Sequence, residues 1–478
     1  MDKNYINKAL NKANNTLEKS KCTLRKFSLV SIVRLVTLVI LFFFTSILCR
    51  SQEFQFLNVF LEGQIYDHAI EELEIEPLLA ELFTHDVRMY RASYEMPFQG
   101  SQINVSGAIF TPLSSNPQDE FPIVVFNHGT TFVRTSVPSF NDEITNMGYL
   151  LSSLGFIVLM PDYVGLGESQ IMHPYCHAQS ESECGWNLVK AFVDSFSEFE
   201  IHTNGNLFIT GYSQGGHVAM AMAMNDMPES IEEDLNLIAV APLSGPYDMS
   251  GVQLPMTFQE ISYSNPAYLF YILKGWNSVY GNIYEEFSEI CNEPYASIIE
   301  SMLDGFHSAE EINAECPEEL IDLFPENLIQ EVLSNPDHII MQHASDNDVY
   351  NWVPTMPVHM RYCTQDEEVF YQNALSASSW MIENGAEDII AYNVGDANHN
   401  DCALSAITNS MLWFYSLNSS GITSVEEDVF IQGSECLIYD LYGRVVYEGH
   451  VEQIQKLNGI FIIKYSPMSK PKKIFISN

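Results

Sequence analysis

The sequence predicts an α/β protein. We expect a mostly parallel sheet covered by helices on both faces, a helical cap insertion, and a small β-sandwich at the C-terminal end. Three observations predict this class. Between residues 120 and 417, short apolar runs of strand length alternate with longer stretches of helical periodicity. Residues 245–356 interrupt this alternation. After residue 424 the pattern changes to short strands separated by glycine turns.

Composition and charge limit the classes of function. The 478 residues are 46% apolar and 17% charged, which indicates a globular chain with room for two or three domains. Residues 1–51 contain nine Lys or Arg and two Asp or Glu, so the remaining residues carry 12 basic and 60 acidic side chains, a formal charge of −48. Such a surface repels phosphate backbones and anionic lipid, which argues against binding to nucleic acid.

The N-terminal residues have the pattern of an export signal. Arg25, Lys26 and Arg34 precede residues 35–48, which carry no charge and are too few to span a membrane comfortably. Small residues follow, so we expect a signal peptide over residues 1–51 that is cleaved before Gln52. An uncleaved anchor is the alternative.

The main domain is expected over residues 52–420. Residues 88–95 and 102–110 alternate apolar and polar side chains, which predicts two antiparallel strands. The buried strands are expected at residues 122–126, 156–160, 207–210, 235–241, 358–362 and 389–393. The helices are expected at residues 141–153, 186–199, 370–384 and 402–417.

The insertion at residues 245–356 is rich in Tyr, Phe, Met and acidic residues, with helical pieces at 296–306 and 309–324. It leaves the sheet after a core strand, and ligands of open α/β sheets bind at the carboxyl ends of the strands. We therefore expect a cap over that edge. The alternative is an ordinary helical subdomain.

The segment Gly211-Tyr212-Ser213-Gln214-Gly215-Gly216 connects the expected strand at 207–210 to a compact, alanine-rich helix. A strand, a sharp turn and a helix with serine at the apex form a nucleophile elbow. Glycine on both sides lets the strand and the helix approach closely. Ser213 is therefore the candidate nucleophile, and a plain tight turn is the alternative.

A serine nucleophile needs a base, and that base needs an acid to orient it. Asp366 follows the expected strand at 358–362, and His399 follows the one at 389–393. The chain order Ser, Asp, His is the one that goes with this elbow. Glu367 and Glu368 are rival candidates for the acid.

Other residues are assigned lesser roles. The main-chain N–H groups of Gln214 and Thr130 are the expected donors to an oxyanion. His217 lies on the helix that follows the elbow and is expected to be structural, whereas His173 and His177 are candidate cleft-lining groups.

Seven cysteines follow the leader, and an exported chain can oxidise them. Cys363 and Cys402 lie three residues from Asp366 and His399, respectively. If those two side chains hydrogen-bond, a disulfide between the cysteines follows. The pairs Cys176–Cys184 and Cys291–Cys316 are also plausible, which leaves Cys436 unpaired. The segment Asp346-Asn347-Asp348 is interpreted as a turn, because the chain has no metal-binding signature.

Together these motifs resemble the secretory lipase family of α/β-hydrolases. The resemblance covers about residues 120–417 and rests on the matching pieces His128-Gly129-Thr130-Thr131, Pro161-Asp162-Tyr163-Val164-Gly165-Leu166-Gly167, His173-Pro174-Tyr175, the elbow, and the Asp366 and His399 loops. It implies a secreted carboxylic-ester hydrolase with a capped acyl pocket, no cofactor, and Ser213, Asp366 and His399 as its triad. Residues 424–478 resemble the type A C-terminal sorting domain of the type IX secretion system of Bacteroidota, which implies the secretion machinery as a partner.

Four functions therefore stay open. The first is an esterase or lipase acting on a small-molecule or lipid ester, and the second is an acetyl or feruloyl esterase of polysaccharide side chains. A serine peptidase is the third. The fourth is a catalytically inactive hydrolase that serves as a binding module.

Overall fold

The computed structural model describes residues 52–71, 82–140, 145–225, 227–260, 263–419, 435–439, 445–450, 459–464 and 472–476. The expected signal peptide lies outside these ranges. Within them, no helix is both long enough and apolar enough to cross a membrane.

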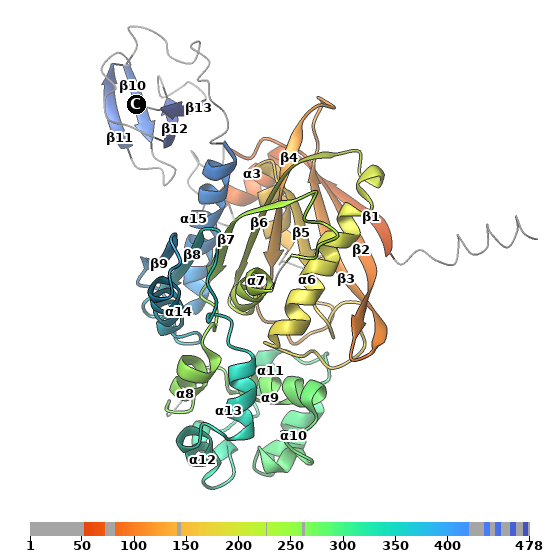
Figure 1. The fold of residues 1–478 in the computed structure, drawn as a ribbon, viewed down its shortest axis with the longest axis vertical. Coiled ribbons are helices and arrows are strands. Elements are labelled where there is room, and N and C mark those ends of the chain that lie inside the picture. The colour runs from red at the N-terminus through yellow and green to blue at the C-terminus, as the bar shows by residue number, and fades with distance from the viewer. Residues whose placement is uncertain are drawn as a thin grey trace, which may run out of the picture. The chain divides into compact units, whose positions relative to one another are not determined.

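A nine-stranded sheet organises the main domain (Figure 1). Its spatial order is β1-β2-β3-β5-β4-β6-β7-β8-β9. The strand β3 pairs antiparallel with both β2 and β5, and all pairs from β5 to β9 are parallel. The strands are β1 (Gln52–Phe60), β2 (Val87–Phe98), β3 (Ser101–Pro112), β4 (Glu120–Asn127), β5 (Ile157–Pro161), β6 (His202–Tyr212), β7 (Asn236–Leu243), β8 (Val358–Cys363) and β9 (Ile389–Gly395).

Helices cover both faces of this sheet. They are α3 (Glu62–Glu71), α5 (Asn146–Ser153), α6 (Ala178–Val193), α7 (Gln214–Met224), α14 (Gln372–Glu383) and α15 (His399–Ser419). Successive side chains of a strand point to opposite faces. In β4, Ile123 and Val125 pack with α6, α7 and α14, whereas Val124 and Phe126 pack with α3, α5 and α15. The strand is apolar at every position because both of its faces are buried.

Two parts of the domain differ from the sequence prediction. The strand β1 and the helix α3 precede the first predicted strand. The helix α6 begins at Ala178, eight residues before the predicted start, and His177 caps it by accepting from the Ser180 N–H. Its first turns look polar in the sequence, but Glu181 lies inside the protein, where hydrogen bonds satisfy its carboxylate. The predicted start of α5, residues 141–144, lies outside the described residues.

The insertion gathers its helices at one end of the sheet (Figure 1, green to cyan). They are α8 (Leu254–Thr257), α9 (Pro266–Tyr280), α10 (Tyr295–Met302), α11 (Ala309–Asn313), α12 (Leu328–Ser334) and α13 (Ile339–Asp346). Their apolar side chains form a third core, centred on Phe270, Trp276 and Ile299. This core also takes in side chains of the main domain, among them Phe132 and Tyr175, so it joins the insertion to the main domain.

The C-terminal strands β10 (Glu435–Tyr439), β11 (Val445–His450), β12 (Gly459–Lys464) and β13 (Lys472–Ile476) form a four-stranded antiparallel sheet in the order β11-β10-β12-β13. Where the sequence predicts a small β-sandwich, the described residues make this one sheet. The segments between its strands lie outside the described residues.

Candidate active site

Ser213 occupies a strained turn between β6 and α7. Its backbone angles are φ 59° and ψ −121°, a region that a residue with a side chain rarely adopts. Close main-chain packing holds the turn in place. A Cβ on Gly215 would lie 1.9 Å from the carbonyl oxygen of Asn127, and one on Gly211 would lie 2.3 Å from that of Gly215. The Ser213 N–H also donates to the carbonyl of Leu243 at 3.0 Å. The glycines are therefore required by space, and the turn presents the serine at its apex.

The structure brings Ser213, Asp366 and His399 together. His399 Nε2 lies 2.9 Å from Ser213 Oγ, and His399 Nδ1 lies 2.8 and 2.9 Å from the two carboxylate oxygens of Asp366. Only 4% to 7% of each of these three residues is exposed. The Asp366 carboxylate also accepts from the N–H groups of Glu368 and Val369 at 3.1 and 2.9 Å. The acid is therefore held in one orientation toward the imidazole.

The surroundings of His399 favour its protonated form. Burial by itself lowers the pKa of this imidazole, but the Asp366 hydrogen bond and the negative charges of Asp366, Glu368 and Glu367 outweigh it and raise the pKa above its ordinary value. An imidazole with a raised pKa holds a proton more tightly than an ordinary one.

The two rival acids have separate places around the same histidine. Glu367 Oε2 accepts from the main-chain N–H of His399 at 3.1 Å, and Glu368 Oε2 lies 3.8 Å from His399 Nε2. Asp366 therefore contacts His399 Nδ1, Glu367 contacts the backbone of His399, and Glu368 lies near Nε2. The sequence contains this run of acids, but the direction of each side chain depends on the backbone after β8.

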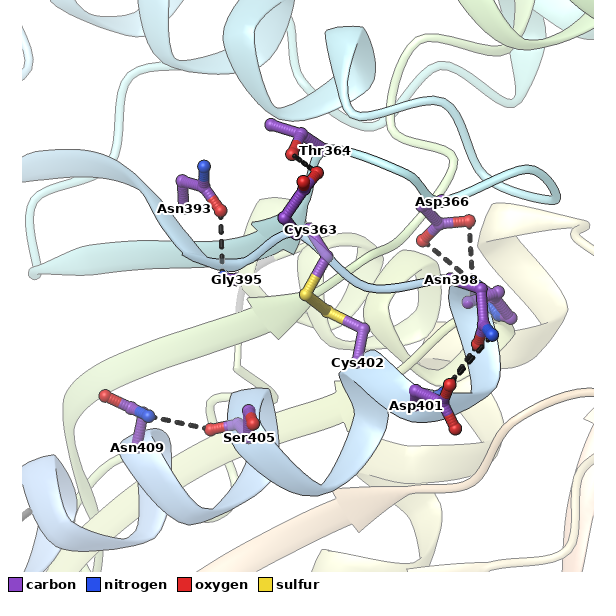
Figure 2. Close-up of a disulfide and its surroundings, with 12 residues drawn as sticks. Cys363, Thr364, Asp366, Asn393, Gly395, Asn398, Asp401, Cys402, Ser405 and Asn409 are labelled. Atoms are coloured by element: carbon purple, nitrogen blue, oxygen red, sulfur yellow. Dashed lines mark hydrogen bonds and ion pairs between the residues drawn. A yellow bond between two sulfur atoms is a disulfide. The ribbon is translucent and has the colours of Figure 1, made fainter.

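A disulfide joins the loops that carry the acid and the base. Cys363 at the end of β8 is bonded to Cys402 in the first turn of α15, with 5.9 Å between their Cα atoms. Figure 2 shows this bond crossing from the strand to the helix, with Asp366 beyond it. The predicted pairing is confirmed.

The other two predicted pairings are wrong, because Cys176, Cys184, Cys291 and Cys316 are free thiols. Each has its own surroundings. Cys184 Sγ lies 3.3 Å from the Tyr94 hydroxyl, and Cys316 Sγ lies 3.5 Å from the carbonyl of Ile312. Burial raises the pKa of the Cys184 thiol to about 12 and that of Cys316 to about 11. These thiols therefore stay protonated and behave as small apolar side chains.

Gln214 and Thr130 lie on either side of the serine. The side-chain amide of Gln214 donates to Glu181 at 2.7 Å and approaches His173 Nε2 at 2.8 Å, which fixes the residue next to the nucleophile. Gly129 brings the other loop close, since a Cβ there would lie 3.8 Å from Ser213 Cβ. Thr130 Oγ1 is held 2.8 Å from the Tyr175 hydroxyl. Both predicted donors therefore belong to segments that contact the elbow.

A buried polar cluster surrounds His217 of α7. His217 Nδ1 lies 2.9 Å from the Glu181 carboxylate, and His217 Nε2 lies 3.0 Å from the Asn347 carbonyl. Each ring nitrogen of His217 therefore lies within hydrogen-bond distance of a protein oxygen atom. Cys176, Glu181 and His217 are the one group of possible metal ligands in the described part of the chain, with ligand atoms within 4.8 Å of one another. Because both ring nitrogens of His217 already have oxygen partners within the protein, the cluster fits a structural hydrogen-bond network better than a metal site.

His173 is buried with its Nδ1 2.6 Å from the Val164 carbonyl, and burial lowers its pKa to about 3. It is therefore neutral and accepts from Gln214 through Nε2. It also lines a cavity of about 210 Å³ together with Phe132, Arg134 and Tyr271. His177 instead caps α6. Of the two candidate cleft-lining histidines, His173 thus lines a cavity, and none of the residues that line it belongs to the elbow or to the loops of Asp366 and His399.

The insertion contacts both loops of the site. On the oxyanion side, the Tyr271 hydroxyl donates to the Thr131 carbonyl at 3.2 Å, and the Tyr271 ring stacks on Phe132 with 4.1 Å between centroids. On the acid side, Gln253 Nε2 and the Tyr263 hydroxyl donate to the Glu368 carbonyl at 2.9 and 3.1 Å. The insertion therefore lies against the site.

Comparisons with known proteins agree with this architecture. The chlorophyllase family profile matches residues 96–265, about a third of the chain. A gibberellin receptor from Oryza sativa subsp. japonica is 25% identical over 161 residues, which are 34% of this chain and 44% of the receptor. The match thus spans less than half the length of that curated relative.

Solved structures match over more of the chain. A protein from Legionella pneumophila described as a hydrolase has a TM-score of 0.69 at 23% identity and covers 78% of this chain and 99% of its own. The rice cell wall degrading esterase LipA from Xanthomonas oryzae has a TM-score of 0.64 at 22% identity, covering 77% and 97%. Lipase A of Candida antarctica has a TM-score of 0.54 at 14% identity, covering 78% and 83%. The main domain has the α/β-hydrolase fold.

Proposed function

We propose that this protein is a carboxylic-ester hydrolase that works through an acyl-enzyme, with Ser213 as nucleophile, His399 as base and Asp366 as its orienting acid. One observation carries the proposal: the hydrogen-bonded series from Ser213 Oγ through both nitrogens of His399 to Asp366, at a strained elbow. The family and the structural neighbours that match the chain include esterases and lipases, which supports the reaction class.

The geometry is suited to each step. Ser213 Oγ attacks the ester carbonyl while His399 Nε2 takes its proton, and Asp366 accepts the hydrogen bond from Nδ1–H. The N–H groups of Gln214 and Thr130 stabilise the negative oxygen of the tetrahedral intermediate. His399 then gives the proton to the departing alcohol, and a water molecule activated by the same histidine releases the acid from Ser213.

The substrate class has two candidates. A small-molecule or lipid ester suits an acyl site covered by a cap with an aromatic wall. A polysaccharide-side-chain ester is the second candidate, and the likeness to an esterase that degrades rice cell walls favours it. A serine peptidase has no specific observation in its favour.

We also propose that residues 1–51 direct the export of the protein and that its C-terminal domain, residues 424–478, is recognised by the type IX secretion machinery. The basic and apolar pattern of the leader and the change in composition after residue 424 support this route. An exported protein would meet the oxidising conditions that a disulfide such as Cys363–Cys402 requires.

Labelling with a fluorophosphonate, together with p-nitrophenyl esters from acetate to palmitate, tests the reaction. Wild type should be labelled and should hydrolyse at least part of the series. Ser213→Ala should lose both properties while keeping its circular dichroism spectrum, because the elbow presents no other nucleophile. Residual activity within about tenfold of wild type would contradict the assignment. A wild type that is neither labelled nor active would favour a binding module, and the similarity to a receptor makes that outcome worth testing.

A further inference from the structure

Glu368 is a buried acid that the proposed mechanism does not use. Its side chain is only 9% exposed, and its Oε2 lies 3.8 Å from His399 Nε2. That nitrogen is the atom that gives its proton to the departing alcohol. The carboxylate therefore lies beside the position that the alcohol part of an ester occupies, on the opposite side of the ring from Asp366.

The insertion fixes this carboxylate in place. Asn265 Nδ2 donates to Glu368 Oε1 at 2.7 Å, and the Tyr268 hydroxyl lies close enough to interact with the same carboxylate. The main-chain carbonyl of Glu368 accepts from Gln253 and Tyr263. Because Oε1 is bound to the insertion, Oε2 is the oxygen that faces His399 Nε2.

A buried carboxylate needs hydrogen-bond donors. The alcohol part of a simple alkyl ester has none, because its only oxygen is bound in the ester. A hydroxyl on the carbon next to the ester-bearing carbon would lie near the departing oxygen and within reach of Oε2. Burial raises the pKa of Glu368, and the charges of Glu367 and Asp366 act in the same direction. A hydroxyl can pair with either protonation state of this acid, because it both donates and accepts. A cationic alcohol would pair only with the ionised form of Glu368, which burial disfavours.

We infer that Glu368 is a specificity-determining residue that receives a hydroxyl of the alcohol part of the substrate, so the preferred esters are those of polyols or sugars. This inference rests on the proposed ester hydrolysis and names its substrate class. It predicts discrimination on the alcohol side, whereas the acyl side is left to other parts of the site.

The experiment compares two esters that share an acyl group, glycerol 1-acetate and propyl acetate, by the ratio of their kcat/KM values. Both substrates use the same His399, so its protonation cancels in the ratio. Wild type should prefer the glycerol ester. In Glu368→Met the ratio should fall about tenfold, since the hydrogen bond between the substrate hydroxyl and the buried carboxyl group is lost. Glu368→Gln, which keeps an acceptor, should retain part of the preference.

Glu367→Gln is the matched control, because it removes a neighbouring charge that faces the backbone of His399 instead of its Nε2. Its ratio should stay within about twofold of wild type, as expected for a contact away from the substrate. Choline acetate serves as a third substrate, and thermal midpoints check that each variant folds.

The outcomes separate the two levels of the argument. If wild type hydrolyses neither these acetates nor p-nitrophenyl acetate, the proposed function fails. If it hydrolyses them but the glycerol-to-propyl ratio is the same in wild type and Glu368→Met, only the role of Glu368 is overturned. A loss confined to choline acetate would also overturn it, in favour of a cationic alcohol.

Discussion

Removal of the Cys363–Cys402 disulfide should lower stability by an amount that the structure allows us to work out. The bond joins residues 39 positions apart, so closing this loop in the unfolded chain stabilises the fold by about 4 kcal/mol on the chain-entropy relation. Both cysteines are buried, and replacing them with alanine, unlike serine, buries no hydroxyl. With about 2.1 cal/mol/K of unfolding entropy per residue over residues 52–420, the thermal midpoint of Cys363→Ala/Cys402→Ala should fall by about 5 °C.

Differential scanning calorimetry with and without a reductant measures this effect. The reductant should lower the wild-type midpoint toward that of the double variant and leave the double variant unchanged. Cys291→Ala is the control for packing alone, because Cys291 is a buried free thiol. Since the bond flanks both the acid and the base, kcat for a p-nitrophenyl ester should also fall in the double variant. The reasoning would be refuted if the reductant left the wild-type thermal midpoint unchanged and the midpoint of the double variant lay within about 1 °C of that of Cys291→Ala.

Four other perturbations test separate parts of the structure. Glu367→Gln removes a negative charge that raises the pKa of His399, so the acid limb of kcat/KM should move to lower pH; a shift to higher pH contradicts this. Because the folded-state pKa of His399 is raised, its protonated form stabilises the fold below the unfolded-state pKa. That contribution is lost as pH rises through the folded value, which denaturation at several pH values should show. Gly215→Ala would place a methyl group 1.9 Å from a main-chain oxygen and should greatly reduce the yield of folded protein, whereas Gly63→Ala meets nothing within 4 Å and should not. Deletion from Ser424 onward should leave the rate per molecule unchanged and alter secretion; a truncated protein that is folded by circular dichroism but inactive would show that the two-domain interpretation is wrong.

From residue 87 onward, the sequence by itself determined the order of the strands and covering helices of the main domain and the place of the elbow that carries Ser213. Both depend on local patterns. An apolar run that is buried on two faces is predicted as a strand wherever it occurs, and the glycines on either side of Ser213 mark the elbow as a local motif. The contact that requires glycine at position 215 comes from Asn127 on β4, which the local motif does not contain. The Cys363–Cys402 bond could also be predicted, because the hypothesis that Asp366 and His399 touch already brings their loops together.

Only the tertiary structure decided which part of His399 each of the three adjacent acids faces. The sequence shows only three adjacent carboxylates. The turn after β8 directs Asp366 to His399 Nδ1, Glu367 to the backbone of His399 and Glu368 toward Nε2. The free thiols and the early start of α6 have the same origin. Whether a polar or sulfur-containing side chain is buried, and against which partner, depends on contacts between residues far apart in the chain, and a local pattern does not contain those contacts.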